Sequence, residues 1–521
     1  GIGVYAEGTT GTIAGGTVNL IGDNAVGYYL TNSSSLTNNG GNIYIDGQNI
    51  VLTISDASSS INFLTPFTIT ATAGSTYVAG SMTGGEFYNN TTATLGSNGM
   101  LINGLGTAVL FGTASNVNST GTNVAGMVLS GRYTDNPLPY PISGTPVNVE
   151  GTNLGTISLG DSSAGIYLMN GARGENKGTI SVNNYSVAMY AEGAGSSVKN
   201  DSGIISIGQE STGLFMKDGA SISNTGTAEI NSTGLKAVGI YSENNLAGSA
   251  TVTNSNKIDL SGDQSIGIYT TGENNVTNTG IINIGNSSSQ TQPGVGIYAD
   301  HAGSSITNSA TGSVNVGDNS IGLYNLNGNV TNSGAITAGN GGTGIYSEGG
   351  TITLNAGSSI TTGQNDAVGV YAVNQTGVVT NNSTVSVGDG SYGFVFTGAT
   401  APTFINNQSA VIGNNSIFVF SDSALSADNS GILTMTGSDN IGYYLKNGGS
   451  FTNNMDIIGN SGVSNIGVYA KGANIINNAD IILGDSNLVE HTDAGGVKYK
   501  TGYSVGIYGE DSNITNNAGN T

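Results

Sequence analysis

The stretch "NVTNTGIINIGNSSSQTQPGVGIYAD" (275–300) is followed at once by "HAGSSITNSATGSVNVGDNSIGLYNL" (301–326), which repeats its phrasing. Versions of the same phrase, roughly ITNxGxIxIGDxSVGIY, continue to the end of the chain. The asparagine of the Thr-Asn step marks the period, because it spans 277 positions in eleven intervals of about 25 residues. A period in the twenties predicts a solenoid. The marker positions are Asn200, Asn224, Asn254, Asn278, Asn308, Asn332, Asn355, Asn381, Asn406, Asn429, Asn453 and Asn477.

Short alternations of apolar and small residues give the expected fold of each repeat. No segment has helical periodicity, and Gly and β-branched residues dominate, so the unit consists of short strands joined by turns. In 281–285 we expect Ile282 and Ile284 to point inward, and in 295–298 Val295 and Ile297, with Gly296 and Tyr298 on the opposite face. The sequence therefore predicts an all-β protein, a right-handed parallel β-helix of about 25-residue coils with irregular loop insertions.

The repeated asparagine has a structural explanation in such a coil. Amides stacked one turn apart can donate and accept along the axis, and Asn tolerates the left-handed conformation of sharp corners. We therefore expect a buried asparagine ladder, and sugar binding by these residues is the less favoured alternative.

A tyrosine recurs once per repeat, usually two positions after a glycine. The expected roles are stacking between neighbouring turns and shielding of a glycine on the same face. An aromatic platform for sugar rings is the rival interpretation. The residues are Tyr167, Tyr190, Tyr241, Tyr269, Tyr298, Tyr324, Tyr346, Tyr371, Tyr444, Tyr469 and Tyr508.

Recurring Gly-Asp and Gly-Asn turns, such as "LGDS" at 159 and "VGDN" at 316, suggest calcium as a hypothesis. Calcium needs six to eight oxygens that converge from several ligands. The calcium-binding nonapeptide of β-rolls is missing, so ordinary Asp-turn chemistry is the preferred interpretation. We expect no cofactor and no metal.

Composition excludes several classes of function. The net charge is −22, from 33 acidic and 11 basic residues, and the two arginines, Arg132 and Arg173, cannot form a nucleic-acid surface. Cysteine is absent, which rules out disulfides and thiolate metal sites. No apolar run approaches the length of a membrane span, and the N-terminus lacks a signal-peptide pattern. Because both ends fall inside repeats, we expect the sequence to be the middle of a longer polypeptide.

The regularity of the repeat divides the chain into three parts. Residues 1–39 are expected to form β-helix repeats, 40–150 degenerate coils with inserted loops, and 151–521 regular repeats with a loop insertion at about 485–504. The degenerate part holds "SGRYTDNPLPYPISGTP" (130–146), with four of the seven prolines of the chain. Proline stiffens an exposed loop, and aromatic and arginine side chains dominate binding hot spots. The candidate binding residues here are Arg132, Tyr133, Asp135 and Tyr140.

A second irregular segment lengthens one coil to 39 residues, from Tyr469 to Tyr508. It contains "DSNLVEHTDAGGVKYKTGYS" (485–504), in which His491, Lys498 and Tyr499 are further candidate binding residues. Glu490, His491 and Asp493 also form a possible metal set, although a single His in a loop is usually only solvated. Insertions are tolerated on solenoids without any function, so both explanations of this segment stay open.

The repeats at 330–350 ("VTNSGAITAGNGGTGIYSEGG") and 466–487 ("IGVYAKGANIINNADIILGDSN") resemble the passenger domains of large fusobacterial autotransporter adhesins of the type Va secretion group. The resemblance covers about 150–521 and 1–30. That family includes arginine-inhibited coaggregation adhesins and relatives that bind galactose or N-acetylgalactosamine. The resemblance implies export to the cell surface, anchoring in the outer membrane by a C-terminal β-barrel outside this sequence, and a role in virulence.

Three functions from different classes are therefore considered. The leading expectation is a lectin-like surface adhesin, a monomeric rod that binds a host-cell glycan, a host receptor protein or the surface of a partner bacterium. The alternative is a passive β-helical stalk whose binding site lies outside this sequence. The third is a polysaccharide-active β-helix enzyme, which is disfavoured because such enzymes need carboxylates clustered on one face. We expect no enzymatic activity.

Overall fold

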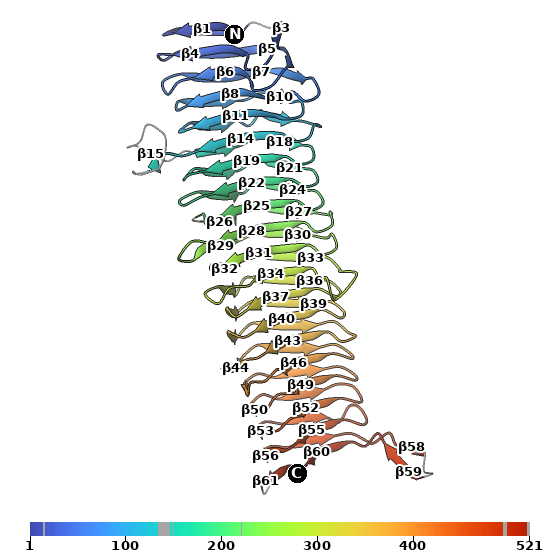
Figure 1. Cartoon of the computed structure of the whole chain (residues 1–521). Coiled ribbons are helices and arrows are strands. Elements are labelled where there is room, and N and C mark those ends of the chain that lie inside the picture. Colours follow the sequence, from blue (N-terminus) through green and yellow to red (C-terminus); the bar gives the residue numbers. More distant parts are fainter. Residues whose placement is uncertain (14–15, 134–145, 148–149, 220, 493–496, 518–521) are drawn as a thin grey trace. The chain divides into compact units, whose positions relative to one another are not determined.

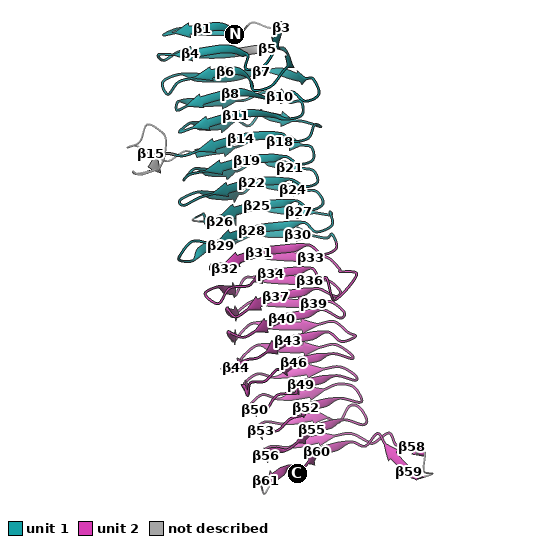
Figure 2. Ribbon diagram, viewed as in Figure 1, with its two compact units in different colours: residues 1–262 teal, residues 263–521 magenta. Residues whose placement is uncertain are grey.

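A computed structural model describes residues 1–13, 16–133, 146–147, 150–219, 221–492 and 497–517 of the chain (Figure 1). These residues form strands, turns and bends, and none of them forms a helix of the length and hydrophobicity that a membrane span requires. The chain divides into two compact units, residues 1–262 and 263–521 (Figure 2).

One turn of the second unit illustrates the repeating element. The strand β37 (Ile321–Leu326) lies in the first sheet, and β38 (Asn329–Asn332) and β39 (Ala335–Ala338) form two rows of the second sheet. Each strand pairs in parallel with the equivalent strand of the next turn, so that Tyr324 lies beside Tyr346 and Asn308 beside Asn332. The predicted parallel β-helix is therefore confirmed.

The first sheet receives one strand from each turn. In the first unit these strands are β1 (Ile2–Glu7), β4 (Val26–Thr31), β6 (Ile50–Ser55), β8 (Tyr77–Thr83), β11 (Gly99–Leu105), β14 (Ala125–Ser130), β19 (Ala164–Met169), β22 (Val187–Glu192), β25 (Thr212–Lys217) and β28 (Val238–Asn244). In the second unit they are β31 (Ile266–Gly272), β34 (Val295–Ala299), β37, β40 (Thr343–Glu348), β43 (Val368–Val373), β46 (Tyr392–Thr397), β49 (Ile417–Ser421), β52 (Ile441–Leu445), β55 (Ile466–Lys471) and β60 (Val505–Glu510).

The second sheet usually receives two short strands from each turn. In the first unit these are β2 (Thr10–Ile13), β3 (Thr17–Ile21), β5 (Ser35–Asp46), β7 (Ser60–Ala71), β9 (Glu86–Asn89), β10 (Thr92–Thr94), β12 (Ala108–Phe111), β13 (Asn116–Asn118), β17 (Glu150–Asn153), β18 (Thr156–Leu159), β20 (Arg173–Asn176), β21 (Thr179–Val182), β23 (Ser197–Asp201), β24 (Ile204–Ile207), β26 (Ser221–Thr225), β27 (Glu229–Ser232), β29 (Ala250–Asn254) and β30 (Lys257–Leu260).

In the second unit they are β32 (Asn274–Asn278), β33 (Ile281–Ile284), β35 (Ser305–Asn308), β36 (Ser313–Val316), β38, β39, β41 (Thr351–Leu354), β42 (Ser359–Thr362), β44 (Val378–Asn381), β45 (Thr384–Val387), β47 (Thr403–Asn406), β48 (Ala410–Ile412), β50 (Leu425–Asn429), β51 (Leu433–Met435), β53 (Gly449–Asn453), β54 (Ile457–Gly459), β56 (Ala473–Asn477), β57 (Ile481–Leu483) and β61 (Asn513–Asn516).

The three rows of strands enclose a narrow apolar core. Leu323, Val330 and Ile336 come from the three rows of one turn, and each is fully buried. The predicted inward positions Ile282 and Ile284 are also buried, and their neighbour Ile281 is 44% exposed. The period-2 interpretation of the second sheet is therefore confirmed.

The predicted facing of the glycines in the first sheet is wrong. A Cβ on Gly296 would lie 2.6 Å from Cγ1 of Val314, a core side chain of the second sheet, and 2.4 Å from the backbone oxygen of Gly322 in the next turn. Gly296 therefore faces the core together with Ile297, whereas Tyr298 points outward. Glycine occupies this position because the strand turns two successive residues inward, which leaves the first of them no room for a side chain.

The repeat pattern weakens within 40–150, but the strands continue through this segment. The strands β5 and β7 are each twelve residues long and run through both rows of the second sheet. The strands β6, β8, β11 and β14 pair in sequence in the first sheet. Parallel pairing in this segment is therefore maintained without the consensus side chains.

The asparagine ladder is confirmed and extended. In the first unit each Nδ2 donates to the Oδ1 of the next asparagine at 2.8–2.9 Å, through Asn153, Asn176, Asn200, Asn224 and Asn254. In the second unit the same kind of bond, at 2.8–3.1 Å, joins Asn278, Asn308 and Asn332, and then Asn381, Asn406, Asn429, Asn453, Asn477 and Asn516.

One predicted rung of the ladder is wrong. Leu354, not Asn355, pairs with Asn332, and it is fully buried. Asn355 lies one residue beyond the corner, where its Nδ2 donates to Oγ of Ser333 at 2.8 Å. Asn332 also donates to the backbone oxygen of Gly334 at 3.2 Å. The side-chain amide of Asn332 therefore keeps a hydrogen-bond partner although its neighbour in the next turn, Leu354, is apolar.

Candidate functional site

The first irregular segment leaves the stack as a short antiparallel pair. β15 (Arg132–Tyr133) pairs with β16 (Pro146–Val147), in a sheet separate from the two large ones. The candidate residues Arg132 and Tyr133 therefore lie in the strand with which the proline segment begins (Figure 1). Asp135 and Tyr140 lie outside the described residues.

The second irregular segment forms a longer hairpin of β58 (Val489–Thr492) and β59 (Lys498–Thr501). Its register brings two of the predicted residues together, because His491 lies opposite Tyr499 with ring centroids 5.2 Å apart. The third, Lys498, forms an ion pair of 2.8 Å with Glu490. Cross-strand pairing places His491 and Tyr499 on one face of the hairpin, and alternation places Glu490 and Lys498 on the other.

The face that carries His491 and Tyr499 also exposes apolar side chains. Val489 is 49% exposed, Val497 62% and Tyr499 51%. A two-stranded hairpin gains little stability alone, and exposed apolar side chains contribute none of it by burial. The hairpin therefore presents an apolar face that the coil does not need for folding.

The suggested metal set on this hairpin is not assembled by its described residues. A carboxylate oxygen of Glu490 lies 2.8 Å from Nζ of Lys498, and Nε2 of His491 lies 2.9 Å from Oγ1 of Thr501. Asp493 lies outside the described residues. Within the part of the chain that the structure describes, no three His, Asp or Glu side chains converge as metal ligands would.

The Gly-Asp and Gly-Asn turns use their side-chain oxygens for structure. Oδ1 of Asp318 accepts from the backbone N–H of Asn340 at 2.8 Å, and Oδ1 of Asn340 accepts from that of Gln364 at 2.9 Å. Oδ1 of Asp161 accepts from the backbone N–H of Asn184 at 3.1 Å in the same way. Each oxygen thus holds the next turn in place, which explains the repeated motif without a cation.

A charged cluster lies on the outer face of β20 and β23. Nζ of Lys199 lies 3.1 Å from a carboxylate oxygen of Asp201 and 3.3 Å from one of Glu175, which also pairs with Lys177 at 2.7 Å. The hydrogen bond from Lys199 lowers the pKa of Asp201. A carboxyl held in its ionised form is poorly suited to act as a general acid, so this cluster gives the enzyme hypothesis no support.

The outward tyrosines stack on one another. In the second unit Tyr269, Tyr298, Tyr324 and Tyr346 follow one another with ring centroids 4.7–5.0 Å apart and planes within 20°. Because neighbouring rings cover both faces of an inner tyrosine, only ring edges and hydroxyls reach the solvent. Burial raises the pKa of Tyr298 to about 12. The tyrosine column therefore stabilises the coil, and its inner rings offer no free face for a sugar.

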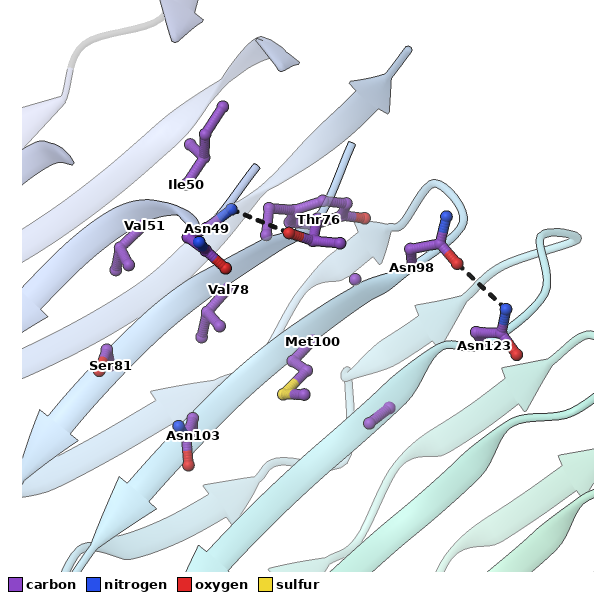
Figure 3. A pocket seen from close by; sticks show the side chains of 13 residues that line it. Asn49, Ile50, Val51, Thr76, Val78, Ser81, Asn98, Met100, Asn103 and Asn123 are labelled. Atoms are coloured by element: carbon purple, nitrogen blue, oxygen red, sulfur yellow. Dashed lines mark hydrogen bonds between the residues drawn. The ribbon is translucent and has the colours of Figure 1, made fainter. Parts of the chain in front are cut away.

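Sequence reasoning missed a groove in the first unit (Figure 3). The tyrosine column is interrupted there, because the positions that follow Tyr29 are Ile54, Ser81, Asn103 and Val128 before a ring returns at Tyr167. Small side chains at this interruption leave an open groove of about 480 Å³ across β6, β8, β11 and β14. The signal was present in the sequence, as the absence of a tyrosine from the column position between Tyr29 and Tyr167.

A second groove, of about 450 Å³, lies in the second unit. It is bounded by Tyr324, Tyr346 and Tyr371 and by the loop around Gln290, whose Nε2 donates to the backbone oxygen of Gly341 at 2.9 Å. Here the tyrosine column is intact and forms one wall. This groove therefore depends on an inserted loop and not on an interrupted column.

No family model, curated protein or solved structure matches this chain.

Proposed function

We propose that this chain is the adhesive part of a surface protein, an outer-membrane autotransporter passenger of the type Va group, which attaches its cell to a host glycan, a host receptor protein or a partner bacterium. One observation carries the proposal. Two segments leave the parallel coils as antiparallel hairpins, and the one at β58–β59 exposes Val489, Val497 and Tyr499 on one face.

The chemistry of this face supports a binding role. An apolar surface that includes an aromatic ring is typical of the centre of a protein interface. Regular turns present the same Asn, Ser and Tyr columns repeatedly and give no single position specificity. The β58–β59 hairpin brings unlike side chains together on a rigid support, which is where recognition usually lies. The proposed action is binding and not catalysis.

The experiment compares single variants on the two faces of the hairpin. Tyr499→Ser and Val489→Ser, on the apolar face, are expected to weaken attachment to host cells or partner bacteria about tenfold or more. Lys500→Ser lies opposite Glu490 on the other face and serves as the matched control. Removing 488–501 and closing with Gly-Ser should leave the coil folded, because the hairpin pairs only with itself.

The proline segment has its own variant. Deleting 132–141 and closing with Gly-Ser should also leave the coil folded, and the proposal expects weaker attachment. If the purified chain never binds cells, or if both hairpin deletions bind as strongly as the parent, the adhesin proposal is wrong. That result would favour the alternative, a passive stalk, which the uniform buried ladder already suits.

A further inference from the structure

We infer that the groove across β6, β8, β11 and β14 binds an uncharged glycan chain. This inference rests on the proposed adhesin function and names a ligand class and a second site for it. The groove is distinct from both hairpins, because its lining comes only from Asn49 to Ala125.

The shape of the groove follows from the interrupted column. At this position on the first sheet, regular turns carry a tyrosine ring that covers the outer face of the strand. Here Ser81 and Asn103 follow Ile54, and the valine at position 128 precedes the next ring. The missing rings open the sheet surface across four successive turns, a span of about 14 Å at 4.8 Å per strand.

The floor of the groove is apolar. Val51, Val78, Met100 and Ala125 are consecutive register partners, one from each turn, and Met100 is 37% exposed. Figure 3 shows Val51, Val78 and Met100 along one line. Ligand sites commonly combine such an apolar surface with a few polar groups, and the C–H faces of sugar rings suit this floor.

Neutral amides and hydroxyls stand along both sides of this floor. Asn49, Thr76, Asn98 and Asn123 lie on the side of the turns, where Nδ2 of Asn123 donates to Oδ1 of Asn98 at 3.1 Å. Ser81 and Asn103 lie on the opposite side, and Asn103 is exposed (Figure 3). Amides both donate and accept, which matches the hydroxyl groups of a sugar.

The same lining disfavours other ligand classes. It contains no Asp, Glu, Lys, Arg or His, and the chain carries a net charge of −22, so sialylated or sulfated glycans would be repelled. An extended peptide normally pairs with a free strand edge. The strands β8 and β11 are paired on both sides, so the groove has no such edge.

The test uses methyl-labelled methionine. Met100 lies on the groove floor, and Met455, in the second unit, is 38% exposed and serves as the internal control. The probes are neutral glucan, mannan and galactan oligosaccharides of increasing length, each with its sulfated counterpart. At least one neutral series is expected to shift the Met100 methyl resonance saturably without moving that of Met455. Its sulfated counterpart should bind about tenfold more weakly or not at all.

Three substitutions make the test specific. Asn103→Tyr restores a ring to the column and fills the groove, so the Met100 shift should disappear. Thr337→Tyr adds the same ring at an exposed position of the second unit and should have no effect. Asn103→Ala removes only the amide and should weaken binding about tenfold, which keeps the test valid if the larger substitution disturbs the turn.

Three results would overturn the inference. The first is that no neutral saccharide shifts the Met100 resonance, and the second is that the shift survives Asn103→Tyr in the folded protein. The third is that peptides shift this resonance and no saccharide does.

Cell attachment separates this inference from the proposed function. If no saccharide shifts Met100 and removal of the hairpins still abolishes attachment, the groove inference fails alone. If saccharides shift Met100 but the chain never attaches to cells, the groove inference stands and the adhesin proposal fails.

Discussion

At one corner of most turns a single buried amide holds two turns together, and Asn308 is the clearest case. It accepts from Nδ2 of Asn278 and donates to Oδ1 of Asn332, both at 2.9 Å, and it is fully buried. We expect Asn308→Ala to lower the free energy of unfolding by about 1–2 kcal/mol, since buried amide groups lose partners. Asn407→Ala is the matched control, because Asn407 donates to Asn382 at 2.9 Å in an exposed ladder. Equal losses of stability in chemical denaturation would contradict this account.

Tyr185 has an unusual backbone conformation for a bulky residue. The turn before a strand of the first sheet often places one residue in the left-handed region, and Asn is the commonest residue there, as at Asn123 with φ 57°, but Tyr185 also has φ 57°. A bulky residue is strained in this conformation by about 1 kcal/mol. We expect Tyr185→Asn to raise the melting temperature. Tyr44→Asn, at an exposed position in the extended strand β5, should not raise it.

At the scale of the strand, adjacent residues face opposite environments. Ile336 in β39 is fully buried, and Thr337 beside it is exposed. Ile336→Asp would bury an unpaired charge, and we expect it to cost several kcal/mol. Thr337→Asp should cost less than about 0.5 kcal/mol. Thermal melts that cannot tell the two variants apart would disprove the assignment of inside and outside.

The strands also show what the sequence can and cannot predict. The alternation of apolar residues and the period of about 25 residues were sufficient to predict the coil, the inward isoleucines and the asparagine ladder. These features depend on side chains that repeat every turn. The facing of Gly296 was not predictable, since a residue without a side chain leaves no hydrophobic signal. The position of Leu354 in the asparagine ladder was missed because an apolar residue can take the place of one asparagine in it. The groove was missed because it is defined by rings that are absent at Ser81 and Asn103.

At the scale of the molecule, charge determines the response to acid. Every described carboxyl with a clear shift has a lowered pKa: hydrogen bonds from Ser59, Lys199, Ser288 and Lys471 act on Asp56, Asp201, Asp263 and Glu510 respectively. A lowered pKa in the folded state adds stability above the ordinary carboxyl pKa of about 4, and that stability is lost as the pH falls below it.

We therefore expect the melting temperature to fall as the pH drops through about 4 and below. The relief of repulsion among 33 acidic residues would act in the opposite direction, but Asp56, Asp201, Asp263 and Glu510 are each stabilised in their ionised form. Asp201→Asn should reduce the acid-induced loss, because it removes one of the responsible groups. A melting temperature that rises on acidification would show that repulsion dominates.

The corner asparagines have a consequence for how such a chain can change in length. Each amide needs only an identical amide one turn away, so the bond from Asn406 to Asn429 is equivalent to that from Asn429 to Asn453. Removal of 407–429 would bring Asn453 to the place that Asn429 now occupies, with its donor and acceptor unchanged. Recombination between repeats of the gene can thus add or delete whole turns, and each new junction inherits a complete set of bonds from the neighbours that it joins.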